Sequence, residues 1–79
     1  MKLNPYGEKL NVAGRHVREL RMKRGLSQEQ LAAKLQLMGY SIGQKAISRM
    51  ETGDRVVTDY ELLLLAQVLN VSPLQLLGQ

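Results

Sequence analysis

The chain has 79 residues, of which 44% are hydrophobic, and its formal net charge is +4, so it is long enough for one small domain with its own core. It contains no cysteine and a single histidine, His16, which excludes disulfides and thiolate metal sites, and its longest apolar run, 62–66, is too short to cross a bilayer. We therefore expect a soluble cytoplasmic protein with no metal, no cofactor, no small-molecule ligand and no membrane partner.

The first segment, 1–10, is expected to be an irregular N-terminal arm, so the domain would comprise residues 11–79. Asn11 can cap a first helix over 11–24. Three- and four-residue spacing would turn part of Arg21 inward, together with three apolar side chains of this helix: Ala13, Val17 and Leu20.

The positive charge is concentrated in the first part of the chain. Residues 1–34 carry a net charge of +5, whereas residues 35–79 carry −1. The basic residues between positions 15 and 24 form either a solvated helix face or a surface that faces phosphates, and the sequence leaves both interpretations open.

Four later positions carry a capping-box pattern, in which a Ser or Thr hydroxyl accepts from a free backbone N–H and a Gln or Glu three residues later reaches back. The pairs are Ser27 with Gln30, Ser41 with Gln44, Thr58 with Glu61, and Ser72 with Gln75. They predict helices over 28–37, 42–51 and 59–70, and a last turn or two that begins at Pro73. A glycine follows four of the predicted segments, at positions 25, 39, 53 and 78, and can adopt the left-handed conformation that ends a helix.

Apolar residues recur at helical spacing, and no segment alternates in the manner of a strand, so we expect an all-α fold. The residues expected to be buried in the three middle helices are Leu31, Ala32, Leu35, Ile42, part of Ala46, Ile47, Met50, Leu62, Leu65, Ala66 and Leu69. The last turn would carry Leu74 and Leu77.

Three strings of the sequence resemble the phage repressor and Cro type of helix-turn-helix, also called the xenobiotic response element family. They are GLSQEQLA at 25–32, AISRMETG at 46–53 and LAQVLNV at 65–71, and the resemblance covers about residues 11–77. It implies a compact five-helix bundle in which helices two and three form the helix-turn-helix and helix three enters the major groove. The function that it implies is a bacterial or phage-type repressor, associated with the nucleoid, that binds double-stranded DNA.

Four residues of helix three match the positions that this family uses to contact bases: Gln44, Lys45, Ser48 and Arg49. A glutamine offers a donor and an acceptor in one plane, which suits adenine, while arginine or lysine suits the paired acceptors of guanine. The alternative for Gln44 is that it only closes the capping box with Ser41. For Lys45 and Arg49 the alternative is a merely solvated position.

The resemblance also assigns residues that would hold phosphates without reading sequence. They are Arg24, Ser27 and Gln28 around the start of helix two, and Thr52 and Arg55 after helix three. Arg21 and Glu51 match a pair that ties helix one to the end of helix three, so their role would be structural.

The turn between helices two and three is longer than in the family's commonest version, because eleven residues separate Leu35 from Ile47. This length leaves the tilt of helix three open. If helix three is lifted, Gly43 and Lys45 would contact phosphate while only Ser48 and Arg49 read bases. Tyr40 would either pack onto the start of helix three as a hydrophobic staple or contact phosphate through its hydroxyl.

A second apolar stripe predicts a homodimer through helix four and the C-terminal turn, because repressors of this kind bind paired half-sites. Its residues are Tyr60, Leu64, Val68 and Leu76. The alternative is a broad buried face. An enzyme is not expected, since His16 has no catalytic partner at a useful spacing and is interpreted as a surface residue. The alternative function is a protein-interaction adaptor or antitoxin-like module on the same scaffold.

Overall fold

Five helices follow one another along residues 7–79, the part of the chain that the computed structural model describes. They are α1 (Gly14–Lys23), α2 (Gln28–Leu37), α3 (Gln44–Thr52), α4 (Asp59–Leu69) and α5 (Pro73–Leu76). No strand occurs in this part of the chain, which confirms the predicted all-α, five-helix fold. Most of the predicted N-terminal arm, residues 1–6, lies outside the described residues.

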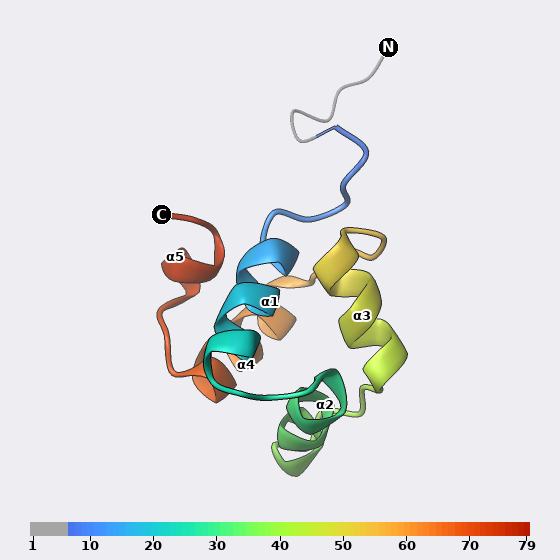
Figure 1. Ribbon diagram of the computed structural model, residues 1–79, viewed down its shortest axis with the longest axis vertical. Helices are drawn as coiled ribbons and strands as arrows, with labels where there is room; N and C mark the ends of the chain where they lie inside the picture. Colours follow the sequence, from blue (N-terminus) through green and yellow to red (C-terminus); the bar gives the residue numbers. More distant parts are fainter. Residues whose placement is uncertain (1–6) are drawn as a thin grey trace.

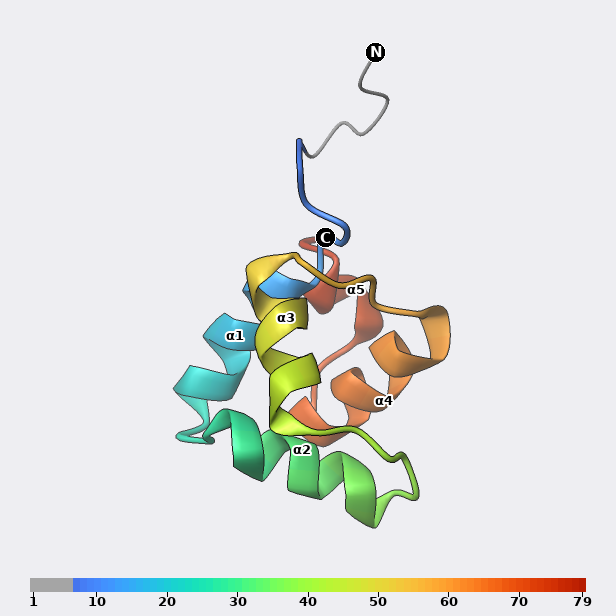
Figure 2. The ribbon, with the colours of Figure 1, turned by 90° about the vertical axis from the view of Figure 1, so that its right-hand side faces the viewer.

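The helices are arranged so that α3 lies at one side of the molecule. Its packing partners are α1, which runs beside it, and α2, which lies across its N-terminal end (Figure 1). α4 packs against α1 and α2, and α5 packs against α4 and α1 on the side of the molecule away from α3. When the molecule is turned by 90°, α3 faces the viewer and no other element crosses in front of it (Figure 2).

The core is formed by apolar residues from all five helices and from the segments that precede α1 and α3. The largest of its fully buried apolar side chains are Val17, Leu31, Leu35, Ile47, Met50, Leu65, Leu69 and Leu76. Each such side chain contributes roughly 1.5–3 kcal/mol when it leaves water, and this burial holds the short helices together. All but Leu76 of these residues were predicted to be buried from helical spacing.

Three of the four predicted capping boxes are confirmed, at Ser27, Thr58 and Ser72. In the first, the backbone N–H of Gln30 donates to Ser27 Oγ at 3.0 Å, and the backbone N–H of Ser27 donates to Gln30 Oε1 at 2.7 Å. These starts were predictable because both partners of each bond lie within one turn of the chain.

The fourth predicted box, at Ser41, is wrong, and helix three begins at Gln44 instead of residue 42. Gly43 is the N-cap residue, in an extended conformation and without a side-chain cap. Ile42 lies in the extended segment before it and is only 7% exposed, because its side chain packs into the core. The Gln44 side chain is turned to α2, so it does not close a box with Ser41.

Helix α1 begins at Gly14, three residues later than predicted, and its N-cap residue is Ala13 instead of Asn11, although the Asn11 side chain binds the first backbone N–H of the helix. Asn11 Oδ1 accepts from the Gly14 amide at 2.7 Å, while its Nδ2 donates to the carbonyl oxygens of Met50 and Arg55 at 3.1 and 2.6 Å. A Cβ on Gly14 would lie 1.9 Å from the Met50 carbonyl oxygen. The start of α1 is therefore fitted closely against the end of α3.

The predicted environment of Leu76 is wrong. Leu76 is fully buried, so it cannot belong to an exposed apolar stripe, whereas Leu74 and Leu77 are exposed. The physical reason is that α5 folds back over α1 and α4 and directs Leu76 into the core. Helix α4 ends at Leu69, and Asn70 adopts the left-handed conformation with φ 57°.

Candidate nucleic-acid interface

Helices α2 and α3 form a helix-turn-helix whose enlarged turn, 38–43, lies to one side of α3. The turn leaves the end of α2, passes on the side of α4 and returns to the start of α3, without crossing the outer face of α3 (Figure 2). Gln36 Nε2 donates to the Ile42 carbonyl oxygen at 2.7 Å and so fixes the end of this turn. The enlarged turn therefore leaves the outer face of α3 uncovered.

The structure places all four of the predicted base-contacting residues on α3, at positions that share one side of a helix. Lys45 and Arg49 are exposed, and neither side chain makes a hydrogen bond or ion pair within residues 7–79. Gln44 and Ser48 are half-buried. Their contact with bases stays a prediction, but the proposal that Gln44 serves only as a capping residue is wrong, because α3 has no side-chain cap.

Gln44 is held by a chain of polar contacts that runs back to α1. Gln44 Nε2 donates to Gln28 Oε1 at 2.6 Å, and Gln28 Nε2 donates to Glu51 Oε1 at 3.0 Å. Arg21 donates to both oxygens of Glu51, through Nε at 2.7 Å and Nη2 at 3.0 Å. Arg21 and Glu51 are buried, and their hydrogen bonds raise the pKa of Arg21. The ion pair thus joins α1 to α3, and through Gln28 it also fixes the start of α2.

The residues predicted to hold phosphate are in different local situations. Arg24 is exposed and unpaired within residues 7–79, and Ser27 is exposed with its hydroxyl already used in the capping box. Thr52 Oγ1 donates to Asp54 Oδ2 at 2.8 Å, so a carboxylate lies beside this predicted phosphate contact. Gln28 is half-buried between Gln44 and Glu51. No role in phosphate binding is tested by these contacts.

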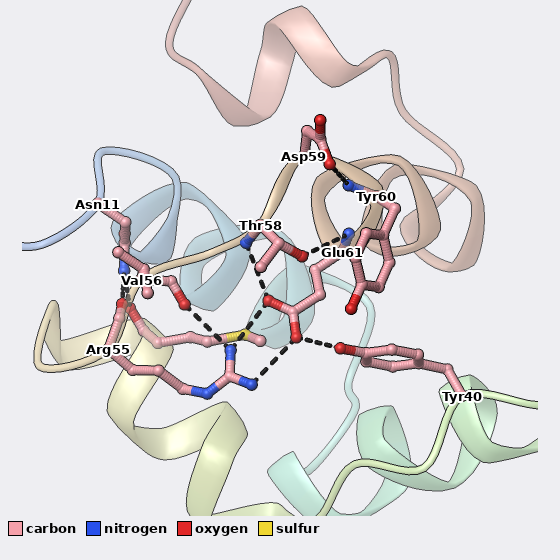
Figure 3. A network of polar contacts seen from close by, with 9 residues as sticks. Asn11, Tyr40, Arg55, Val56, Thr58, Asp59, Tyr60 and Glu61 are labelled. Carbon is pink, nitrogen blue, oxygen red and sulfur yellow. Dashed lines mark hydrogen bonds and ion pairs between the residues drawn. The ribbon is translucent and has the colours of Figure 1, made fainter.

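Arg55, the fifth of them, points into the molecule toward Glu61 (Figure 3). Its Nη1 and Nη2 donate to the two oxygens of Glu61 at 2.9 and 3.0 Å, and Nη1 also donates to the Val56 carbonyl oxygen at 3.0 Å. These contacts engage both terminal nitrogens of the guanidinium. Among the five residues predicted to hold phosphate, Arg55 is therefore the one whose side chain is least available for a phosphate.

Glu61 is a residue whose wider role sequence reasoning missed, because it was interpreted only as the closing residue of a capping box. It is 2% exposed. Burial alone would raise the pKa of its carboxyl, but hydrogen bonds from Arg55, Tyr40 and the Thr58 amide lower this pKa to about 2. The only signal in the sequence is a carboxylate directly before a run of four leucines.

Tyr40 adopts neither of the two predicted roles. Its hydroxyl donates a short hydrogen bond to Glu61 Oε2, so it faces α4 rather than a phosphate, and this hydrogen bond raises the pKa of Tyr40. Its ring lies edge-on to Tyr60, with 5.6 Å between the ring centroids. Tyr40 therefore packs against α4 and is not a staple on the start of α3.

Residues 7–79 contain no cluster of three His, Asp or Glu side chains that could hold a metal ion. Within the same residues, no helix has the length and apolar character that a bilayer-spanning segment needs.

Comparison with known proteins agrees with the resemblance seen in the sequence. A family model described as helix-turn-helix matches residues 17–76. The high-resolution crystal structure of the restriction-modification controller protein C.AhdI from Aeromonas hydrophila is similar, with a TM-score of 0.71 and 34% identity over 81% of this chain and 89% of that chain. A search of curated proteins gave no match. The chain belongs to the Cro and C1 type of helix-turn-helix family and is a DNA-binding transcriptional regulator.

Proposed function

We propose that the chain is a sequence-specific repressor that reads the major groove with α3. The observation that carries this proposal is that the side chains of Lys45 and Arg49 are exposed and, in the described part of the chain, unpaired. Both side chains are exposed on α3 and have no partner within residues 7–79, and no other element crosses in front of this helix in Figure 2. Two unpaired cations on a narrow, open helix suit the acceptor-rich edge of guanine in the major groove.

The polar chain behind α3 supports a reading role for Gln44. Because Gln28 accepts one N–H of the Gln44 amide, the remaining donor and acceptor of that amide keep a defined orientation. Such an amide can form two hydrogen bonds with adenine. Ser27 and Gln28 lie at the start of α2, where the helix dipole favours a phosphate, and exposed Arg24 lies four residues before Gln28.

We also propose that the working form is a homodimer, because paired half-sites need two reading helices. Of the residues predicted for its interface, Tyr60 is 53% exposed, Leu64 and Val68 are half-buried, and Leu76 is excluded by its burial. Leu63 on α4 and Leu74 on α5 are 54% and 59% exposed. We therefore place the interface on Tyr60, Leu63 and Leu74.

A protein-interaction adaptor is the second candidate function, and a specific observation favours it. Leu37, at the end of α2, is 89% exposed, and Met38 beside it is 41% exposed. An adaptor would use this apolar end of α2, whereas a repressor needs the basic side of α3. The two functions therefore assign the binding energy to different surfaces.

Selection of bound fragments from a random pool of DNA duplexes tests the proposed function. We expect a palindromic consensus, because a symmetric dimer would read two equal half-sites. The matched control is the double variant Lys45→Ala and Arg49→Ala, which should recover no consensus while it keeps the fold. A reporter gene with the selected site across its promoter then tests repression. A wild-type protein that enriches no sequence would contradict DNA reading and favour the adaptor.

A further inference from the structure

Two irregular connections flank α3, and both are fastened to the same carboxylate. The connection 38–43 precedes α3 and the connection 53–58 follows it. Tyr40 in the first and Arg55 in the second both bind the side chain of Glu61, which belongs to the first turn of α4 (Figure 3). Residues on both sides of α3 in the sequence therefore meet at one point.

The connection after α3 is held by charge-assisted bonds. Arg55 spans the two oxygens of Glu61 at 2.9 and 3.0 Å, and the Thr58 amide donates to Oε1 at 3.0 Å. The backbone of Arg55 is fixed as well, because its carbonyl oxygen accepts from Asn11 Nδ2, which also donates to the Met50 carbonyl oxygen within α3. The C-terminal half of α3 is thus linked through Arg55 to α4.

The connection before α3 is bonded to Glu61 through a single hydroxyl. Tyr40 donates to Oε2 of Glu61, and its ring packs edge-on against Tyr60. Downstream in the same connection, the Ile42 carbonyl oxygen accepts from Gln36 Nε2 at 2.7 Å. Gly43 caps α3 without a side-chain bond, so these contacts act on the start of α3 together with the bond from Gln44 to Gln28 and the burial of Ile42.

We propose that Tyr40, Arg55 and Glu61, here called the Glu61 cluster, set the tilt of α3 and thereby its discrimination between DNA sequences. The three are positioning residues, because they act through the two connections and do not touch DNA. The proposal rests on the proposed function. It assigns Arg55 a role other than the phosphate contact that the sequence predicted, and it gives the enlarged turn a purpose, which is to carry Tyr40 to α4.

The variant Tyr40→Phe tests the cluster, because it keeps the ring and its contact with Tyr60 and removes only the hydroxyl. We expect the ratio of operator affinity to random-duplex affinity to fall about 3- to 30-fold, the range of indirect coupling, while binding to random duplexes and its salt slope stay unchanged. Residual dipolar couplings of the backbone amides should fit a changed orientation of α3 relative to α4. The control is Ser72→Ala, which removes a helix cap at α5 and should lower stability without changing the ratio or the orientation.

Arg55→Lys separates the two roles of Arg55. Lysine keeps the charge that a phosphate would need but cannot span both oxygens of Glu61. A positioning role predicts a lower operator-to-random ratio for Arg55→Lys, whereas a phosphate role predicts an unchanged ratio and an unchanged salt slope.

The proposal is overturned by an unchanged ratio in Tyr40→Phe, or by couplings that fit the wild-type orientation of α3 in that variant. A wild-type protein that prefers no duplex would instead overturn the proposed function. The role of the cluster in placing α3 would then be decided by the couplings alone, which need no DNA.

Discussion

The side-chain amide of Gln44, on α3, donates a hydrogen bond of 2.6 Å to the side-chain oxygen of Gln28, at the first position of α2. The two helices of the helix-turn-helix are therefore joined through the side chains that are expected to meet the DNA. Gln28 in turn donates to Glu51, which is paired with Arg21. The orientation of Gln44 therefore depends, through Gln28, on this buried ion pair.

Gln28→Ala should weaken discrimination by Gln44 without removing it. The variant leaves Gln44 in place but takes away the acceptor that orients its amide, and we expect a loss of about 1 kcal/mol at the base pair that Gln44 reads. Fluorescence anisotropy with operators substituted one base pair at a time measures this loss. The control is Gln67→Ala, on the exposed side of α4. An equal loss at every position of the operator would show that Gln28 contributes only through phosphate.

Arg49→Ala and Arg24→Ala should affect DNA binding in different ways. Arg49 is expected to contact a base, so its loss should reduce the preference for the operator by about 1–3 kcal/mol. Arg24 is expected to contact a phosphate, so its loss should weaken all duplexes alike and lower the salt slope by about one unit. Titrations at several salt concentrations, on operator and random duplexes, separate the two effects. Indistinguishable behaviour of the two variants would remove the distinction between base and phosphate contacts.

The parts of the fold that were predictable from sequence are those fixed by local chemistry. The helix starts at Ser27, Thr58 and Ser72 follow from bonds within a single turn, and most of the core follows from helical spacing. The same capping pattern was misleading at Ser41, because burial of Ile42 outweighs a local bond. Leu76 was misplaced because α5 has four residues, too few to show a periodicity.

The candidate site was predictable only in part. The pattern of α3 indicates which residues lie on its outer side, and the resemblance supplies the pairing of Arg21 with Glu51, which the structure contains. The Glu61 cluster was not predictable, because its members come from three separate segments and meet only in the folded chain. A buried carboxylate can be suspected from sequence, but its partners cannot be named.

Stability should depend on pH through Glu61. The pKa of its carboxyl is about 2 in the folded protein and near 4.5 without its partners, so its stabilising contribution is fully present above about pH 5 and is lost as the pH falls toward 2. The shift corresponds to about 3 kcal/mol. Urea unfolding between pH 7 and pH 2.5 measures this change. Glu61→Gln, although less stable at pH 7, should show a flatter dependence; a slope equal to that of the wild type would assign the effect to other carboxylates.

Gly14→Ala should destabilise the protein because α1 and α3 approach closely at this point. The added Cβ would lie 1.9 Å from the Met50 carbonyl oxygen, which is backbone and cannot move without shifting α3. We expect a loss of about 1–3 kcal/mol or more in the free energy of unfolding, and for a domain of this size a fall in Tm of about 4–8 °C per kcal/mol. The control is Gly43→Ala, where a Cβ would meet nothing within 4 Å and the cost should stay below about 1 kcal/mol. Similar melting temperatures for both variants would contradict the close approach.

Leu63→Glu and Leu76→Ala should separate association from folding. Leu63 is 54% exposed, and a carboxylate there should break the proposed dimer while the monomer keeps its melting temperature. Leu76 is fully buried, so its truncation should cost about 2–5 kcal/mol of stability, whatever the oligomeric state. Sedimentation velocity at micromolar concentration, together with thermal unfolding, distinguishes the two outcomes. If Leu63→Glu sediments as the wild type does, the apolar surface on α4 and α5 is not the dimer interface, and the two reading helices must be brought together in another way or act singly.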